Sequence, residues 1–97
     1  MLQVKRIEII VDALEIPNVV RRLEAAGVSG YTIIKDATGM GERGLRDAGE
    51  LTDVFKNSYL LTTCLPEQIE RIVEAIRPIL KLRGGVCLVS DAQWVIH

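Results

Sequence analysis

The sequence predicts an α+β fold in which two helices lie on one face of a four-stranded antiparallel sheet. Two observations lead to this prediction. Four short segments are rich in β-branched and other apolar residues and read as strands. Two longer segments carry apolar residues three and four positions apart, as on one face of a helix. At 97 residues the chain has room for one domain, which we expect to span residues 1–97.

The first half of the chain reads as strand, helix and strand. Residues 3–11 interleave β-branched with charged residues, which predicts the first strand. Pro17 suits the first turn of a helix, and the apolar spacing that starts at Ile16 continues to Gly27, a residue that favours a helix end. Residues 31–34 follow as a second, short strand.

The second half repeats this order. Residues 59–65 predict a strand, residues 66–80 a helix, and residues 86–89 a fourth strand after a tight turn at 83–85. An apolar segment follows at 94–96. Right-handed crossovers in a βαββαβ chain give an antiparallel sheet with both helices on one face, which is a ferredoxin-like arrangement.

This arrangement leaves one face of the sheet bare. Because the strands carry many apolar residues, we expect that face to pack against other subunits. The alternative is a monomer whose second face is unusually polar. The small size of the chain also favours a ligand cleft between subunits, since a deep cleft is hard to build inside one.

The segment from about residue 36 to residue 55 stands out because it lacks apolar periodicity. It holds four of the eight glycines, and five charged residues fall between Gly39 and Glu50. A connection of this length in a compact domain is usually functional or disordered. We therefore place the first candidate site in this segment.

Residues 39–44 match the pattern GxGxxG. The dinucleotide-binding reading is rejected because no helical run follows at 45–50 and the chain is too short for that fold. The segment still has the composition of an anion-binding loop. Its glycines let backbone amides approach an anion, and Arg43 and Arg46 supply forked donors suited to phosphate or carboxylate. The alternative is a solvated loop whose arginines pair with its own acids.

Composition excludes several function classes. With 12 Lys plus Arg against 13 Asp plus Glu, the net charge is −1, so no overall field draws the chain to nucleic acid or anionic lipid. RNA binding would need exposed aromatics, and only Tyr31 and Tyr59 are available, without the RNP pattern. His97 is the sole histidine, which excludes a histidine-based triad or metal cluster. Cys64 and Cys87 lack CxxC spacing and read as reduced core thiols.

Several segments resemble the PII signalling superfamily. Residues 27–32 (GVSGYT) look like the family's turn into its second strand, residues 65–68 (LPEQ) like the start of its second helix, and the turn at 84–85 like its B-loop. Residues 39–49 (GMGERGLRDAG) are similar to the GxGxRxxRxxG T-loop of the PII-like proteins linked to inorganic-carbon uptake, the bicarbonate-transporter regulator and the carboxysome-associated protein. The resemblance places a T-loop at about 36–55 and a B-loop at about 82–86.

This resemblance implies a homotrimer with its sheets packed inward and three nucleotide sites in the clefts between neighbours. Each cleft would take the T-loop base and B-loop from one subunit and strand residues from the next. Arg43 would contact the phosphates, and Arg46 would be a second anion ligand. The implied nucleotide-binding residues are Gly30, Thr32, Gly39, Gly41, Arg43, Arg46, Thr63, Cys64, Gly84 and Gly85.

Among these residues the resemblance assigns three roles. Gly39 and Gly41 would join Arg43 at the phosphates, and Gly84 and Gly85 would offer B-loop amides. Gly30, Thr32, Thr63 and Cys64, on the strand side, would line the adenine and ribose, largely through backbone groups. Arg43 and Arg46 are also the implied bicarbonate ligands.

Departures from the family pattern narrow the function. The tyrosine region and the glutamine that ordinary PII proteins use in nitrogen sensing are missing, and the B-loop reads RGGV where ordinary PII has GDGK. The C-terminal arginines by which ordinary PII holds a triphosphate are also missing, and with fewer cations ADP, AMP or cAMP should compete well against ATP. The resemblance further implies bicarbonate as a second ligand, and a bicarbonate transporter or carboxysome component as the protein partner.

We therefore expect a signalling protein, not an enzyme, with no resident cofactor or metal. Its longest uncharged runs, one of them residues 57–66, are far below the roughly 18 residues of a membrane helix, so we expect a cytoplasmic protein, peripheral to the membrane or to a carboxysome only through its partner. Two alternatives remain open. One is an ACT-like module that binds amino acids between subunits, and the other is an enzyme that slowly hydrolyses the nucleotide.

Overall fold

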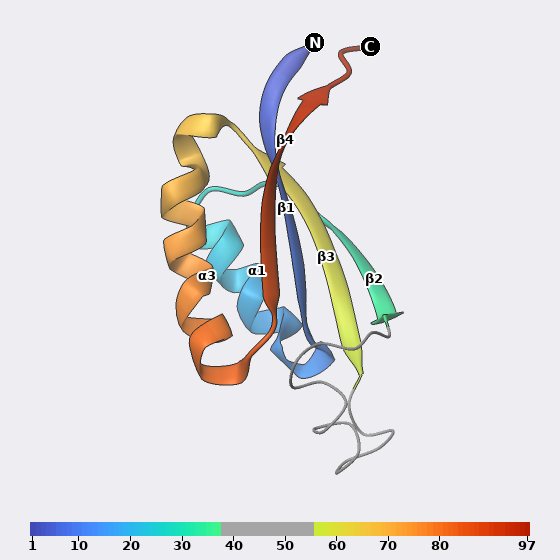
Figure 1. Ribbon diagram of the computed structural model, residues 1–97, viewed down its shortest axis with the longest axis vertical. Coiled ribbons are helices and arrows are strands. Elements are labelled where there is room, and N and C mark those ends of the chain that lie inside the picture. The colour runs from blue at the N-terminus through green and yellow to red at the C-terminus, as the bar shows by residue number, and fades with distance from the viewer. Residues whose placement is uncertain (38–55) are drawn as a thin grey trace.

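The computed structural model describes residues 1–37 and 56–97 (Figure 1). The strands are β1 (Leu2–Asp12), β2 (Thr32–Ala37), β3 (Asn57–Cys64) and β4 (Val86–Trp94). The helices are α1 (Ile16–Ala25) and α3 (Ile69–Arg83), each entered through a short 3-10 turn, η1 (Ala13–Glu15) and η3 (Pro66–Gln68). This order confirms the predicted βαββαβ chain.

The sheet has the strand order β2-β3-β1-β4, and every neighbouring pair is antiparallel. Figure 1 shows α1 and α3 side by side on one face of this sheet, with the other face uncovered. The α+β architecture predicted from the sequence is therefore confirmed. The edge strands are β2 and β4, so the two halves of the chain meet at the centre of the sheet, where β1 pairs with β3.

Some element boundaries differ from those predicted. The second strand extends to Ala37, three residues beyond its predicted end, because Ala37 still pairs with Asn57 after a register shift. The fourth strand includes Trp94, which the sequence placed in a separate segment, because β1 is long enough for Leu2 to pair with Trp94. Pro66 opens a 3-10 turn, and the α-helix proper begins at Ile69.

The core lies between the helices and the facing side of the sheet. The sheet contributes the buried side chains of alternate residues in β1 and of Leu60 in β3. Helix α1 buries Val19 and Leu23, one turn apart, and α3 buries Ile72, Ile76 and Ile79 at the spacing of one helix face. The helix end predicted at Gly27 is confirmed, since that residue has φ of 103° and follows the last turn of α1.

We call the sheet surface that points away from the helices the open face. The strand register places on it Arg6, Glu8, Ile10, Thr32, Ile34, Tyr59, Leu61, Thr63, Val86, Leu88 and Ser90. Ile34, Val86 and Leu88 are 55%, 45% and 54% exposed. The open face is therefore mixed, with exposed apolar residues around a polar centre, and its packing against other subunits stays a prediction.

Candidate functional site

The turn from α3 into β4 carries the predicted B-loop residues Gly84 and Gly85. Both have left-handed backbones, with φ of 81° and 117°. The amide of Gly84 donates to the carbonyl of Leu80 at 2.8 Å, which closes the last turn of α3. A Cβ on Gly85 would lie 2.8 Å from the Ile10 carbonyl oxygen, so the turn packs directly on β1. Glycine is required at both positions by the fold itself.

The opening of β2 and the end of β3 bring the strand-side residues together. Thr62 donates its hydroxyl to the carbonyl of Gly30 at 2.5 Å, which joins the segment before β2 to β3. Thr32 pairs with Leu61, and Thr63 is two residues further along the same face. A Cβ on Gly30 would meet nothing within 4 Å, so packing within the chain does not require glycine there.

Cys64 ends β3, and its thiol lies on the helix side of the sheet, in the core. Burial is the main cause that raises its thiol pKa, and the nearby Glu67 carboxylate raises it further, against a smaller opposing effect of Lys5. Burial also raises the pKa of the Cys87 thiol. Both thiols are therefore neutral at ordinary pH and unsuited to nucleophilic chemistry. Any contact of Cys64 with a ligand on the open face would have to come from its backbone.

The predicted phosphate and bicarbonate ligands Gly39, Gly41, Arg43 and Arg46 lie outside the described residues. The described residues on either side of that segment have defined contacts. Ala37 pairs with Asn57, and the amide of Ala13 donates to the carbonyl of Lys56 at 2.7 Å.

Asp36, next to this exit, has a left-handed backbone with φ of 60°. Asn57 pairs with Asp12 at the end of β1, and Gly85 packs on the same end of β1 through Ile10 and Val11. The chain therefore leaves and re-enters the described structure at the end of the sheet that holds the Gly84–Gly85 turn (Figure 1).

The two sets of described site residues lie apart within one chain. Gly85 borders β4 and Gly30 precedes β2, which are opposite edges of the sheet and so about 14 Å apart across three strand spacings. Along β1, Cys64 pairs with Lys5, five residues before Ile10, a separation of about 17 Å. Within one chain the two sets therefore do not form a single site.

Two hollows in the described part of the surface are shallow and lie on the helix side. One lies between the helices over Ala25, Ala26 and Ala75, and the other runs along α3. Neither touches a predicted nucleotide-binding residue. Within residues 1–37 and 56–97 no group of three potential metal ligands occurs, and no helix there is long and apolar enough to cross a membrane.

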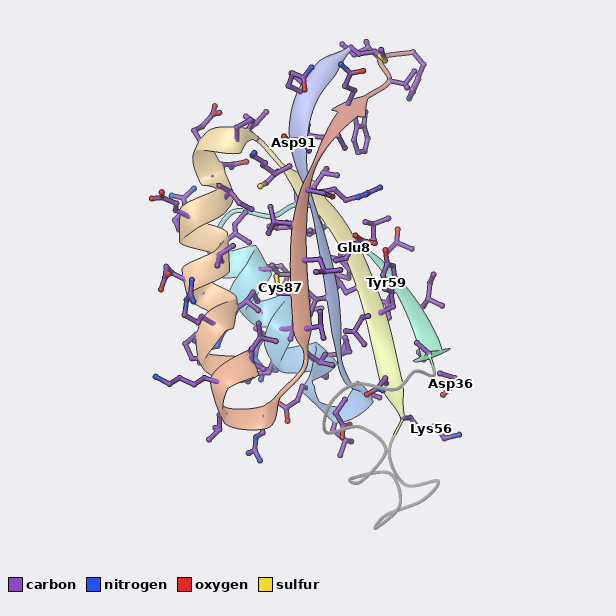
Figure 2. All side chains as sticks on the ribbon, viewed as in Figure 1. Glu8, Asp36, Lys56, Tyr59, Cys87 and Asp91 are labelled. Carbon is purple, nitrogen blue, oxygen red and sulfur yellow. The ribbon has the colours of Figure 1, made fainter. Side chains whose placement is uncertain are left out.

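Four polar residues at the centre of the open face form contacts that the sequence did not reveal. We call Arg6, Glu8, Tyr59 and Ser90 the polar cluster. The Tyr59 hydroxyl donates to Glu8 Oε1 at 2.6 Å, and Arg6 Nε donates to Ser90 Oγ at 3.0 Å while lying 3.7 Å from Glu8 Oε2. Figure 2 shows Glu8 and Tyr59 together on the side away from the helices.

The hydrogen bond to the Glu8 carboxylate, and then burial, raise the pKa of Tyr59. The one signal in the sequence for this cluster was weak. Arg6 and Glu8 are two positions apart, so they share a face of the predicted strand.

Comparison with known proteins identifies the family. The model of the nitrogen regulatory protein P-II family matches residues 4–96. No curated protein is significantly similar to the chain in sequence.

Similar solved structures are those of CPII, a nitrogen regulatory PII-like protein from Thiomonas intermedia K12. Its complex with ADP, AMP and acetate has a TM-score of 0.82 and 23% identity, covering 98% of this chain and 91% of that one. Its complex with ADP, AMP and bicarbonate has a TM-score of 0.81 and 24% identity, covering 98% and 96%. Its complex with ADP and bicarbonate has a TM-score of 0.79 and 26% identity, covering 95% and 88%.

The family match and the βαββαβ sheet agree with the resemblance seen in the sequence, and the chain belongs to the nitrogen regulatory protein P-II family.

Proposed function

We propose that this protein is a trimeric PII-like signalling protein that binds ADP or AMP in preference to ATP in clefts between subunits, together with bicarbonate. The observation that carries the proposal is the separation of the two sets of described site residues. The Gly84–Gly85 turn and the Gly30–Thr32 segment lie at opposite edges of one sheet. Two neighbouring copies can bring the turn of one against the strand residues of the other.

The relatives support the ligand class. One structure of CPII holds ADP, AMP and bicarbonate, and another, 26% identical to this chain over the aligned region, holds ADP and bicarbonate. The segment 39–49 of this chain, GMGERGLRDAG, fits the GxGxRxxRxxG pattern of PII-like proteins linked to inorganic carbon. Its two arginines are suited to a phosphate and a neighbouring monoanion.

In this proposal one subunit supplies the anion side of the site. The backbone of Gly84 and Gly85 lies at the same end of the sheet as both ends of the segment that carries Arg43 and Arg46. Gly39 and Gly41 bring backbone amides to the phosphates, and the arginines neutralise them. The neighbouring subunit supplies Gly30, Thr32, Thr63 and the backbone of Cys64 on the adenine and ribose side.

In this proposal the signal is the ordering of the T-loop, about residues 36–55, which costs conformational entropy. Contacts to nucleotide and bicarbonate offset that conformational entropy only when both ligands are present. Each ligand therefore raises the affinity of the other by the same factor. The conformation selected by the ligands is read by a protein partner, for which a bicarbonate transporter or a carboxysome component is our proposal, with the protein itself in the cytoplasm.

Calorimetric titration of ADP, AMP, ATP and cAMP into the protein, with and without bicarbonate, tests this proposal. We expect ADP and AMP to bind more tightly than ATP, and bicarbonate to tighten them further. Chloride at the same ionic strength is the control for charge screening. Equal nucleotide affinities in bicarbonate and in chloride would contradict the proposed coupling between the two ligands. The absence of any nucleotide binding would overturn the proposed function.

A further inference from the structure

The polar cluster leaves the end of the Arg6 side chain without a partner among the described residues. Both of its contacts there, to Ser90 and to Glu8, are made through Nε. The terminal nitrogens of the guanidinium therefore keep their donors for another acceptor. The Arg6 side chain is 48% exposed, and that of Glu8 is 25% exposed.

Apolar side chains surround this cluster on the open face. Ile34 on β2 and Val86 and Leu88 on β4 lie on either side of it, each about half exposed. Several large apolar residues exposed on one face of a sheet are typical of an interaction surface. A protein surface that covers these residues also covers the cluster, and the uncommitted donors of Arg6 then need an acceptor because unpaired buried donors are costly.

A second copy of this chain supplies that acceptor. Its open face carries the same apolar residues and the Glu8 carboxylate, which accepts one bond from Tyr59 and has lone pairs left over. The face therefore carries, two residues apart on β1, an arginine with uncommitted terminal donors and a carboxylate with lone pairs left over. Such a surface is complementary to itself in a rotational arrangement, where the donor of each copy meets the acceptor of the next.

We propose that Arg6 of each copy donates to Glu8 of the next copy across the open faces, so that three such pairs close a ring and fix the number and register of subunits. This inference rests on the proposed trimer. The ring determines which residues of neighbouring subunits lie opposite each other, as a single buried polar residue does in a coiled coil. The surrounding apolar residues supply the attraction, and the ring selects the closed three-fold arrangement over other packings of the same faces.

Charge reversal at the two positions tests the ring. Arg6→Glu and Glu8→Arg each place like charges at every contact, so we expect each variant alone to lose the trimer when its mass is measured by native mass spectrometry. In a mixture of the two variants, a mixed trimer has opposite charges at two of its three contacts, so we expect mixed trimers to outnumber the trimers of either variant alone. An ion pair that acts only within one chain would not be repaired by mixing, so a mixture with no more trimer than the separate variants overturns the proposal.

Two further variants separate this outcome from misfolding and from failure of the proposed function. Lys5→Glu also breaks an ion pair of β1, with Asp91 at 2.6 Å, but on the opposite face, and we expect its trimer to persist. Glu8→Gln keeps an acceptor for Tyr59, and we expect its trimer to dissociate at a concentration at least about tenfold higher than wild type, the effect of losing a modest interfacial ion pair. A wild-type monomer would overturn the proposed function itself, whereas a wild-type trimer that survives both charge reversals would overturn the ring alone.

Discussion

Gly85 lies so close to Ile10 that no side chain fits between them: a Cβ on Gly85 would stand 2.8 Å from the Ile10 carbonyl oxygen and 2.8 Å from Val11 Cγ1. The contact locks the start of β4 onto the end of β1. Gly85 is therefore needed for the packing of the turn on β1, whether or not it also contacts a nucleotide as proposed. Close by in the sequence, the Arg83 guanidinium lies 3.6 Å from the Glu15 carboxylate and so joins the end of α3 to η1.

Gly85→Ala should lower the free energy of unfolding by at least about 2 kcal/mol, because the substitution adds a backbone clash to a strained left-handed conformation. The measurement is urea unfolding at one fixed protein concentration. Gly30→Ala is the matched control, since nothing lies within 4 Å of the added carbon and its backbone is not left-handed. Equal destabilisation by the two substitutions would contradict the packing argument.

Gly30→Ala should instead weaken ADP binding, since the open space at Gly30 is where the neighbouring subunit's nucleotide is proposed to approach. We expect the unfolding free energy to change by less than about 0.5 kcal/mol, as for a surface position. Calorimetric titration of ADP measures the effect. An unchanged ADP affinity in a stable trimer would remove Gly30 from the proposed site.

The elements of this fold were predictable because their signals are local. Apolar periodicity located both helices and all four strands, and Gly27 marked a helix end that the structure confirms. The strand ends were less accurate because pairing decides them. Ala37 belongs to β2 only because it pairs with Asn57 of β3. Trp94 belongs to β4 because it pairs with Leu2 of β1.

The polar cluster was not predictable for a similar reason. Arg6 and Glu8 are recognisable as neighbours on one face, but Tyr59 is 51 residues from Glu8 and Ser90 is 84 residues from Arg6. Only the register of β1 with β3 and β4 brings these four side chains together. The candidate nucleotide residues came from a resemblance in sequence, which assigned the two sets to neighbouring subunits but gave no positions for them within one sheet.

Arg43→Ala should weaken ADP binding by at least about 1.5 kcal/mol, the contribution of a hydrogen bond to a charged group, which is roughly a tenfold rise in Kd. Calorimetry with and without bicarbonate measures it. Arg22→Ala, on the exposed surface of α1, removes the same charge away from the proposed site and should leave the affinity unchanged. An Arg43→Ala protein that binds ADP as wild type does would refute the proposed phosphate contact.

Tyr59 should make the fold sensitive to alkaline pH. The hydrogen bond to Glu8, followed by burial, raises the pKa of Tyr59 above its ordinary value of 10.0 in the folded state. Below that value both folded and unfolded chains hold the proton, so the stabilisation is fully present. As the pH rises further the unfolded chain loses its proton first, and this stabilisation is lost up to the raised pKa of the folded state.

Urea unfolding between about pH 9 and pH 11 should therefore show a steeper loss of stability for wild type than for Tyr59→Phe, which has no phenol proton at this position to lose. In a Tyr31→Phe background Tyr59 is the sole tyrosine, so the absorbance of tyrosinate follows its ionisation alone. Adding Glu8→Gln removes the carboxylate charge and should bring the pKa of Tyr59 down towards 10.0. A Tyr59 pKa unaffected by Glu8→Gln would mean that the 2.6 Å contact between the two side chains does not persist in solution.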